Sequence, residues 1–163
     1  MVNNKIHKSA DISKKASVGK NTYVWNNAQI RENAKVGKNC VISKDVYIDK
    51  NVVVGDNCKI QNSALIYDGV KIKNNVFVGP GVVFTNDYFP RADKKNWKIK
   101  KTIVEFGASI GANATILCGI TIGIYAFVGA GTVVLADVPD YALIVGNPGK
   151  LIGWVDEKGS RLK

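Results

Sequence analysis

The sequence predicts an all-β protein built as a parallel β-helix, and the first observation behind this prediction is a column of aliphatic residues spaced six apart. A short fixed period of this kind is typical of β-helices, whereas an α-helix would place apolar residues three or four apart. The column comprises Ile12, Val18, Val24, Ile30, Val36, Ile42, Ile48, Val54, Ile60, Ile66, Ile72, Val78 and Phe84, followed by Val104, Ile110, Ile116, Ile122, Val128 and Val134.

Two further columns keep the same register. Four residues after each aliphatic stands a small or β-branched side chain, such as Ala28, Cys40 or Val46. The residue before it is mostly Asn, Asp or Gly, for example Asn39 and Asp45. These residue types tolerate the left-handed backbone angles that a tight corner requires. Each hexad is therefore interpreted as a short strand and a corner, with the aliphatic and the small residue facing inward.

The length of 163 residues favours a single domain, 1–163. We expect coils over 10–136, a loop excursion over 86–103 and a C-terminal loop and tail over 137–163. No stretch approaches the roughly 20 apolar residues of a membrane span. The first residues lack the apolar core of a signal peptide. These observations predict a cytoplasmic protein with no membrane partner.

The net charge of +10 raises the question of nucleic acid. The lysines are spread along the outward positions of the repeat, without the interleaved aromatic residues that stack bases. We therefore expect no nucleic-acid partner. A cationic surface would instead attract small polyanions such as nucleotides and coenzyme A.

The cysteines fit a reducing compartment. Cys40 and Cys58 hold the same position in hexads one coil apart and should stack on one inner column. They are interpreted as reduced core thiols, with a disulfide or a metal pair as the alternative. Cys118 lies in a corner and is not expected to act as a nucleophile. No metal site is predicted.

The six-residue repeat is interrupted between Phe84 and Val104, in the segment FTNDYFPRADKKNWKIKKTIV. A long insertion in a regular scaffold is usually functional. Asn86 can hydrogen-bond an amine or a hydroxyl, Asp87 can hold an ammonium, and Arg91 can bind an anion. The alternative is a surface loop in which Asn and Asp supply ordinary turn hydrogen bonds.

The hexads VGKNTY, VGKNCV, VGDNCK and IGANAT resemble the hexapeptide-repeat acyltransferase family. The resemblance implies a left-handed parallel β-helix with three hexads to a coil, hence about six coils here, and a short C-terminal helix or tail. It also implies a homotrimer with sites between subunits, where the loop and Trp97 would cap a groove.

Many members of this family deprotonate a hydroxyl acceptor with a histidine, and one relative binds zinc through three histidines. This chain has a single histidine, His7, near its start and far from the loop. A zinc enzyme is therefore excluded, and a histidine base is not expected. An amine needs less help than an alcohol, because its neutral form is already nucleophilic. The sequence thus favours N-acylation over O-acylation.

The segment IQNSALIYDGVKIKNNVFVGPGVVFTNDYFPRA and the glycine-rich C-terminal coils are similar to the nucleotide-sugar 3-N-acetyltransferases. That group acetylates a 3-amino sugar carried on dTDP or UDP. The resemblance implies that Asn86 contacts the acceptor amine and that the coenzyme A sulfur helps to remove the proton. It makes Asn86 and Asp87 the candidate catalytic residues. The candidate substrate-binding residues are Arg91, Trp25, Asn26, Tyr67 and Asn62.

Relatives often carry Trp-His where this chain has Trp25 and Asn26, so Asn26 would contact the acceptor differently. Trp25 fits a subunit contact equally well. Threonine, asparagine and aspartate at 85–87 favour a dTDP-3-amino-3,6-dideoxyhexose, with a UDP-3-amino-uronate as the alternative acceptor. A non-catalytic trimeric β-helix scaffold is the alternative outside enzymes.

The acetyl-CoA site is expected on the C-terminal coils. Glycines there would let a pantetheine arm lie along the coil, although glycine also satisfies corners. The terminal loop GNPGK would approach the coenzyme, with a lysine for its phosphates. The candidate cofactor-binding residues are Gly107, Ala126, Gly131, Asn147, Pro148 and Lys150.

Overall fold

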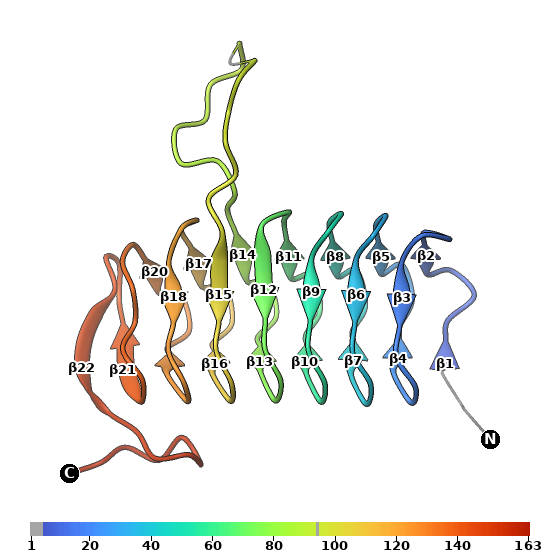
Figure 1. The fold of residues 1–163 in the computed structure, drawn as a ribbon. Helices are drawn as coiled ribbons and strands as arrows, with labels where there is room; N and C mark the ends of the chain where they lie inside the picture. Colours follow the sequence, from blue (N-terminus) through green and yellow to red (C-terminus); the bar gives the residue numbers. More distant parts are fainter. Residues whose placement is uncertain (1–4, 94) are drawn as a thin grey trace.

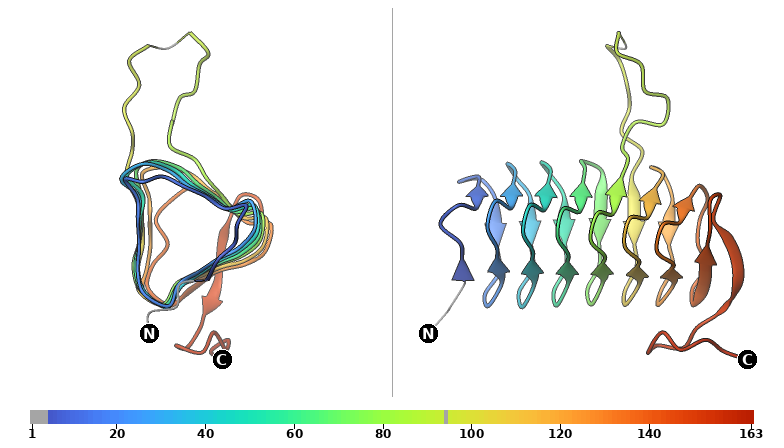
Figure 2. Two further views of the ribbon diagram at one scale, coloured as in Figure 1. Left: turned by 90° about the vertical axis from the view of Figure 1, so that its right-hand side faces the viewer. Right: turned by 180° about the vertical axis from the view of Figure 1, so that it is seen from behind.

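The protein is a β-solenoid of about eight turns, seen in a computed structural model that describes residues 5–93 and 95–163 (Figure 1). Viewed along its axis, the solenoid has a triangular cross-section, and one long loop projects from a corner (Figure 2). Three sheets, here named A, B and C, form the three faces.

Up to β20 each sheet collects every third strand of the chain, and β21 and β22 both join sheet A. In spatial order, sheet A contains β1 (Lys5–Ile6), β4 (Tyr23–Val24), β7 (Val41–Ile42), β10 (Lys59–Ile60), β13 (Phe77–Val78), β16 (Ser109–Ile110), β19 (Phe127–Val128), β21 (Ala142–Val145) and β22 (Lys150–Trp154). Sheet B contains β2 (Asp11–Ile12), β5 (Gln29–Ile30), β8 (Tyr47–Ile48), β11 (Leu65–Ile66), β14 (Val83–Phe84), β17 (Thr115–Ile116) and β20 (Val133–Val134). Sheet C contains β3 (Ser17–Val18), β6 (Lys35–Val36), β9 (Val53–Val54), β12 (Val70–Ile72), β15 (Thr102–Val104) and β18 (Thr121–Ile122).

Apart from β21 and β22, neighbouring strands of a sheet are parallel and pair equivalent residues of successive turns, as Ile42 pairs with Ile60. Across the long loop the same pairing continues, since Phe77 pairs with Ser109. The loop therefore adds residues between two turns without changing how the turns stack. This explains why the six-residue repeat of aliphatic residues resumes out of phase at Val104.

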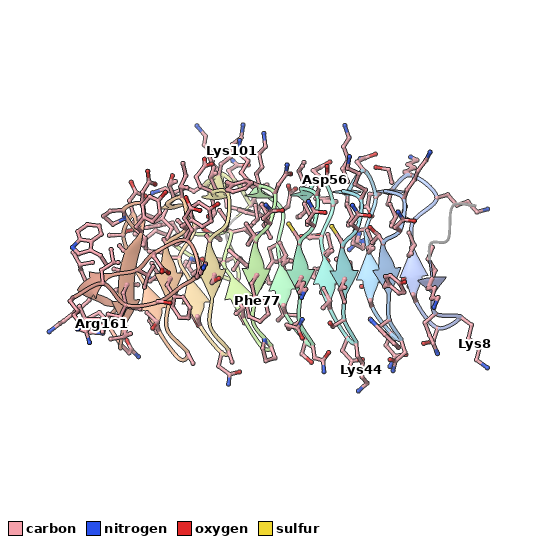
Figure 3. The ribbon with its side chains drawn as sticks, turned by 90° about the horizontal axis from the view of Figure 1, so that it is seen from below. Lys8, Lys44, Asp56, Phe77, Lys101 and Arg161 are labelled. Carbon is pink, nitrogen blue, oxygen red and sulfur yellow. The ribbon has the colours of Figure 1, made fainter. Side chains whose placement is uncertain are left out.

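The inward columns predicted from the sequence form the core. The aliphatic column is fully buried from Val24 to Phe84 apart from slight exposure at Val36, and the small residues between, such as Ala64, are inaccessible to solvent. Cys40 and Cys58 are free and buried, as predicted, and Cys118 is free and buried as well. Charged side chains such as Lys8, Lys44 and Lys101 project away from the solenoid (Figure 3).

The corners confirm the interpretation of the third column. In the described part of the chain many residues other than glycine have positive φ, among them Asn21, Asn39 and Asn57 with φ of 59°, 56° and 58°. Their side chains form a ladder, because the Asn21 amide donates to Asn39 at 3.3 Å and the Asn39 amide donates to Asn57 at 3.2 Å. Asparagine thus serves both the backbone conformation and the contact between turns.

The structure differs from two expectations. The solenoid has about eight turns rather than six, since eight strands of sheet A, from β1 to β21, stack in parallel along its axis. No helix is present among the described residues. In the region expected to form a short C-terminal helix or tail, Lys150–Trp154 form the strand β22, antiparallel to β21, and 155–163 follow as a tail. A strand satisfies the exposed backbone edge of β21, which a helix would leave unpaired.

The long loop occupies 85–101, so Ile103, expected in the loop, already belongs to β15. Two threonines hold its ends. Thr85 Oγ1 accepts the Cys118 N–H at 2.9 Å, and Thr102 Oγ1 accepts the Gly119 N–H at 3.1 Å. None of the described segments forms a helix that is long and apolar enough to cross a bilayer.

Replacing Ile60 by Ala should lower the free energy of unfolding by about 2–5 kcal/mol, because the side chain is fully buried in the stack. The neighbouring residue Lys59, which points outward from the same strand, is the matched control. Urea unfolding of Ile60→Ala and Lys59→Ala checks the prediction. Equal losses in the two variants would contradict the assignment of inward and outward columns.

Replacing Thr102 by Val should cost about 0.5–1.5 kcal/mol, since the part-buried hydrogen bond from the Gly119 N–H to the threonine hydroxyl would be lost. The outward-facing Thr121→Val, in the next strand of sheet C, should change stability little. Thermal melting of both variants tests this. A similar melting temperature for the two would show that the threonine hydroxyl does not hold the loop.

Candidate active site

A groove of about 310 Å³ lies where the long loop leaves the solenoid, at the corner between sheets B and C. We call it the loop groove. Its lining comes from three turns of the corner and from both arms of the loop. The lining residues are Arg31, Tyr47, Asp49, Lys50, Asp68, Asn86, Trp97 and Ile99.

The repeat of three hexads per turn brings these corner residues together. Arg31 and Asp49 occupy equivalent positions on successive turns, as do Lys50 and Asp68. Asn86 takes the position equivalent to Asp68 on the following turn, just after β14. The loop groove is therefore a product of stacking rather than of one contiguous motif.

One wall of the loop groove is a hydrogen-bonded network. Arg31 binds both carboxylate oxygens of Glu32, at 2.9 and 3.0 Å, and donates to the Tyr47 hydroxyl at 3.1 Å. The Tyr47 hydroxyl donates to Asp49 at 3.0 Å. Such a network fixes each side chain in one orientation.

The pKa values follow from these contacts. The Glu32 carboxylate raises the pKa of Arg31, and the Arg31 hydrogen bond lowers the pKa of Glu32. Burial, and then the bond to Asp49, raises the pKa of the Tyr47 phenol. Arg31 and Tyr47 therefore keep their protons at neutral pH, and the network presents fixed donors.

Two carboxylates of the loop groove are buried. Asp49 is 9% exposed and accepts the Tyr47 hydroxyl and the Lys50 N–H through one oxygen, and the Asp68 N–H through the other. Asp68 is 8% exposed and accepts the Asn51 side-chain amide at 3.2 Å. Asp49 is thus saturated by protein donors, and Asp68 is not.

The loop contributes Asn86 from its first arm and Trp97 and Ile99 from its second. Gly69 allows the second arm to lie this close, because a Cβ at Gly69 would collide with the Ile99 side chain. Trp97 is 41% exposed. Its indole adds apolar surface to a lining that also contains the buried carboxylates.

The other residues expected near Asn86 lie outside this lining. Asp87 accepts the Phe89 N–H at 3.0 Å, the turn bond considered as the alternative. Arg91 is exposed and donates to the Pro90 carbonyl at 2.8 Å. Tyr67 is a close neighbour of the loop groove, with its ring centroid 5.6 Å from that of Tyr47.

The remaining expected acceptor contacts sit at a different corner, between sheets A and B. The Asn26 carbonyl accepts the Asp45 N–H, and the Asn62 carbonyl accepts the Gly81 N–H of the next turn. Trp25 is 51% exposed and lines a separate hollow near the N-terminal end with His7 and Tyr23. One subunit does not bring Trp25, Asn26 or Asn62 to the loop groove.

The expected coenzyme residues lie toward the C-terminal end of the solenoid. Asn147, Pro148 and Lys150 are located around the turn that joins β21 to β22. A Cβ at Gly131 would meet open space, whereas a Cβ at Gly107 would collide with the Tyr125 ring. The fully buried Ala126 can offer a ligand only its backbone.

Sequence reasoning missed Arg31, Tyr47, Asp49, Lys50 and Asp68. A signal was present, because counting back three hexads from Asn86 reaches Asp68, and three more reach Lys50. Among the described residues, no group of three or more His, Cys, Asp or Glu side chains could hold a metal ion.

Comparison with protein families gives two partial matches. The model of the GMPPB C-terminal domain matches residues 26–87, and the model of the hexapeptide repeat of succinyl-transferase matches residues 101–136. The two matches flank the loop on either side. The repeats before and after it therefore both resemble those of known families.

A curated relative is the dTDP-3-amino-3,6-dideoxy-alpha-D-galactopyranose 3-N-acetyltransferase of Aneurinibacillus thermoaerophilus. It is 57% identical over 63 residues, which cover 39% of this chain and 33% of the relative. This chain thus matches about a third of that protein's length.

Two solved structures are similar over more of the chain. A maltose O-acetyltransferase from Clostridium difficile 630 has a TM-score of 0.66 and 27% identity, over 88% of this chain and 72% of that one. A hexapeptide-repeat acetyltransferase from Vibrio cholerae O1 biovar eltor, complexed with acetyl coenzyme A, has a TM-score of 0.59 and 25% identity, over 71% and 70%. In its repeat, its solenoid and these partial matches, the chain is similar to the hexapeptide-repeat β-helix acetyltransferases.

Proposed function

We propose that this protein transfers the acetyl group of acetyl-CoA to the 3-amino group of a nucleotide-linked amino sugar, with a dTDP-3-amino-3,6-dideoxyhexose as the favoured acceptor. The observation that carries the proposal is the 57% identity to the dTDP-3-amino sugar N-acetyltransferase. The loop groove, which contains Asn86, supports it as a site for a small polar acceptor.

The reaction needs a neutral amine next to the thioester. The nitrogen lone pair forms a bond to the acetyl carbon, and the carbon–sulfur bond breaks. The sulfur leaves as a thiolate and takes a proton from the nitrogen, which gives the amide and free coenzyme A. Asn86 orients the amine through its side-chain amide, so that the lone pair points at the carbonyl.

The rest of the loop has supporting roles in this proposal. Asp87 holds the turn through its bond to the Phe89 N–H and keeps Asn86 in place. Arg91 lies on the exposed part of the loop and is suited to an anionic group of the acceptor. Acetyl-CoA lies along the C-terminal coils toward the loop between β21 and β22, with Lys150 near its phosphates.

The homotrimer expected from the family belongs to the same proposal. Trp25, Asn26 and Asn62 lie at a different corner from the loop groove and can complete the acceptor site only from a neighbouring subunit. A UDP-linked 3-amino-uronate is the alternative acceptor. A scaffold without activity is the alternative outside enzymes, and it would bind no acetyl-CoA.

Asn86→Ala should lower kcat/KM for the amino sugar by about 100-fold, the range for a misplaced reacting group. The assay is thiol release from acetyl-CoA with dTDP-linked and UDP-linked 3-amino sugars side by side. Asn96→Ala, in the same loop but outside the groove lining, is the matched control and should retain activity. No turnover by the wild-type protein with any nucleotide-linked amino sugar would overturn the proposed function.

His7→Gln should leave kcat within about twofold of the wild type, whereas loss of a general base typically costs about 100-fold or more. His7 lies in the N-terminal hollow, where its ring nitrogen is 2.9 Å from the Ser9 hydroxyl. The likeness to a maltose O-acetyltransferase makes this comparison informative. A large loss of activity in His7→Gln would favour a hydroxyl acceptor.

A further inference from the structure

Asp68 is a carboxylate in an unusual situation. Its residue exposure is 8%, and Asp side chains this deeply buried are rare unless they are paired. Among the described residues, no Lys, Arg or His nitrogen forms an ion pair with its oxygens. Arg31 and Lys50 also line the loop groove, but neither forms an ion pair with Asp68. A buried carboxylate without a paired cation is costly, so a cationic ligand would be stabilised here.

The hydrogen bonds of Asp68 leave one side open. Its Oδ2 accepts the Asn51 amide at 3.2 Å, and its backbone N–H donates to Asp49 at 3.2 Å. Within the described part of the chain, Oδ1 has no hydrogen-bond partner. Asp68 Oδ1 is accessible to solvent. Among the described side chains, the one nitrogen or oxygen atom that is both fully enclosed and without a hydrogen-bond partner is Thr132 Oγ1.

Two other aspartates of the solenoid that are comparable to Asp68 are paired with cations. Asp49, on the preceding turn, has Arg31 at 4.0 Å and accepts three protein donors. Asp45 also accepts an asparagine amide of the corner ladder, from Asn27 at 3.2 Å, but it is paired with Lys44 at 2.8 Å. Asp68 differs from both in lacking a cation, and it lines the loop groove together with Asn86.

We infer that Asp68 binds the ammonium form of the acceptor amine and positions its nitrogen beside Asn86. This inference rests on the proposed function and names the group that receives the acceptor. An amine with a pKa near that of an α-amino group, about 8, is mostly protonated at pH 7. A single open carboxylate oxygen suits an N–H donor with positive charge, and the bond is stronger than one to a neutral hydroxyl.

The proton balance follows from this placement. The bound ammonium loses one proton to water, which leaves a neutral nitrogen held at the same place. The lone pair then attacks the acetyl carbon, and the departing sulfur takes a second proton from the nitrogen. Asp68 is therefore a binding and positioning residue, and it makes the enzyme select an amine over the corresponding alcohol.

The test is Asp68→Asn, which keeps an oxygen for the Asn51 amide. The Kd of the Asp68→Asn variant for the nucleotide-linked amino sugar, measured calorimetrically at pH 7 without acetyl-CoA, should be about 10- to 100-fold higher than that of the wild type. The Kd for the same nucleotide sugar with a hydroxyl in place of the amine should be the same in both proteins. The KM for acetyl-CoA should not change.

The pH dependence separates charge recognition from a structural role. Wild-type affinity for the amino sugar should fall as pH rises from 7 to about 9.5, because the ammonium form is lost above the pKa of the amine. In Asp68→Asn this dependence should disappear. The matched control is Asp45→Asn, which removes a carboxylate from the same type of ladder at another corner and should behave as wild type.

The outcomes are distinguishable. Wild-type turnover together with unchanged amino-sugar affinity in Asp68→Asn would overturn the role of Asp68 and leave the proposed function intact. Equal losses of affinity for the amino and the hydroxy sugar would also overturn it, since the variant would then have disturbed the loop groove as a whole. Absence of turnover with every nucleotide-linked amino sugar would overturn both.

Discussion

The structure depends on the registered stacking of inward-facing side chains from one turn to the next. Every turn places an aliphatic residue over the equivalent residue of its neighbour, as Ile42 lies over Ile60, at the roughly 4.8 Å spacing of paired strands. Because the column continues through the whole solenoid, each inner turn is covered by two others, and no single turn has a core of its own. The same stacking sets the positions of the outward residues at the corners.

The candidate site uses this stacking directly. A corner is an irregular piece of chain that would be mobile in isolation, but here it is held by the turns above and below. The Arg31, Tyr47 and Asp49 network joins two successive turns, and the Asn51 amide links its own turn to Asp68 on the next. The loop then supplies Asn86 and Trp97 over a floor that is already rigid. Preorganisation of this kind lowers the cost of ordering a site around a small acceptor.

The sequence predicts the repeat far better than it predicts the site. Columns such as Val24 to Phe84 and the corner asparagines obey local rules of burial and backbone conformation, and the structure confirms both. The strand β22 was not predicted because Lys150–Trp154 has no hexad pattern. These residues form a strand by pairing with the edge of β21. The role of Asp68 was not predicted because the residue occupies an outward corner position of its hexad, where aspartates are usually exposed. Its place beside Ile99 and Trp97 in the loop groove depends on the path of the loop, which no periodicity encodes.

The way the loop joins the solenoid has an evolutionary consequence. β15 pairs with β12 in ordinary parallel register, Val70 with Thr102, although the whole loop lies between them in the chain. The packing of the core therefore does not depend on the number of residues between Thr85 and Thr102, provided that both ends of the loop are held. Insertions, deletions or wholesale exchange of this segment among related chains can proceed without a folding penalty in the stack. Because the loop supplies Asn86, Trp97 and Ile99 to the loop groove, such changes alter the lining of the groove while the stacked strands stay the same.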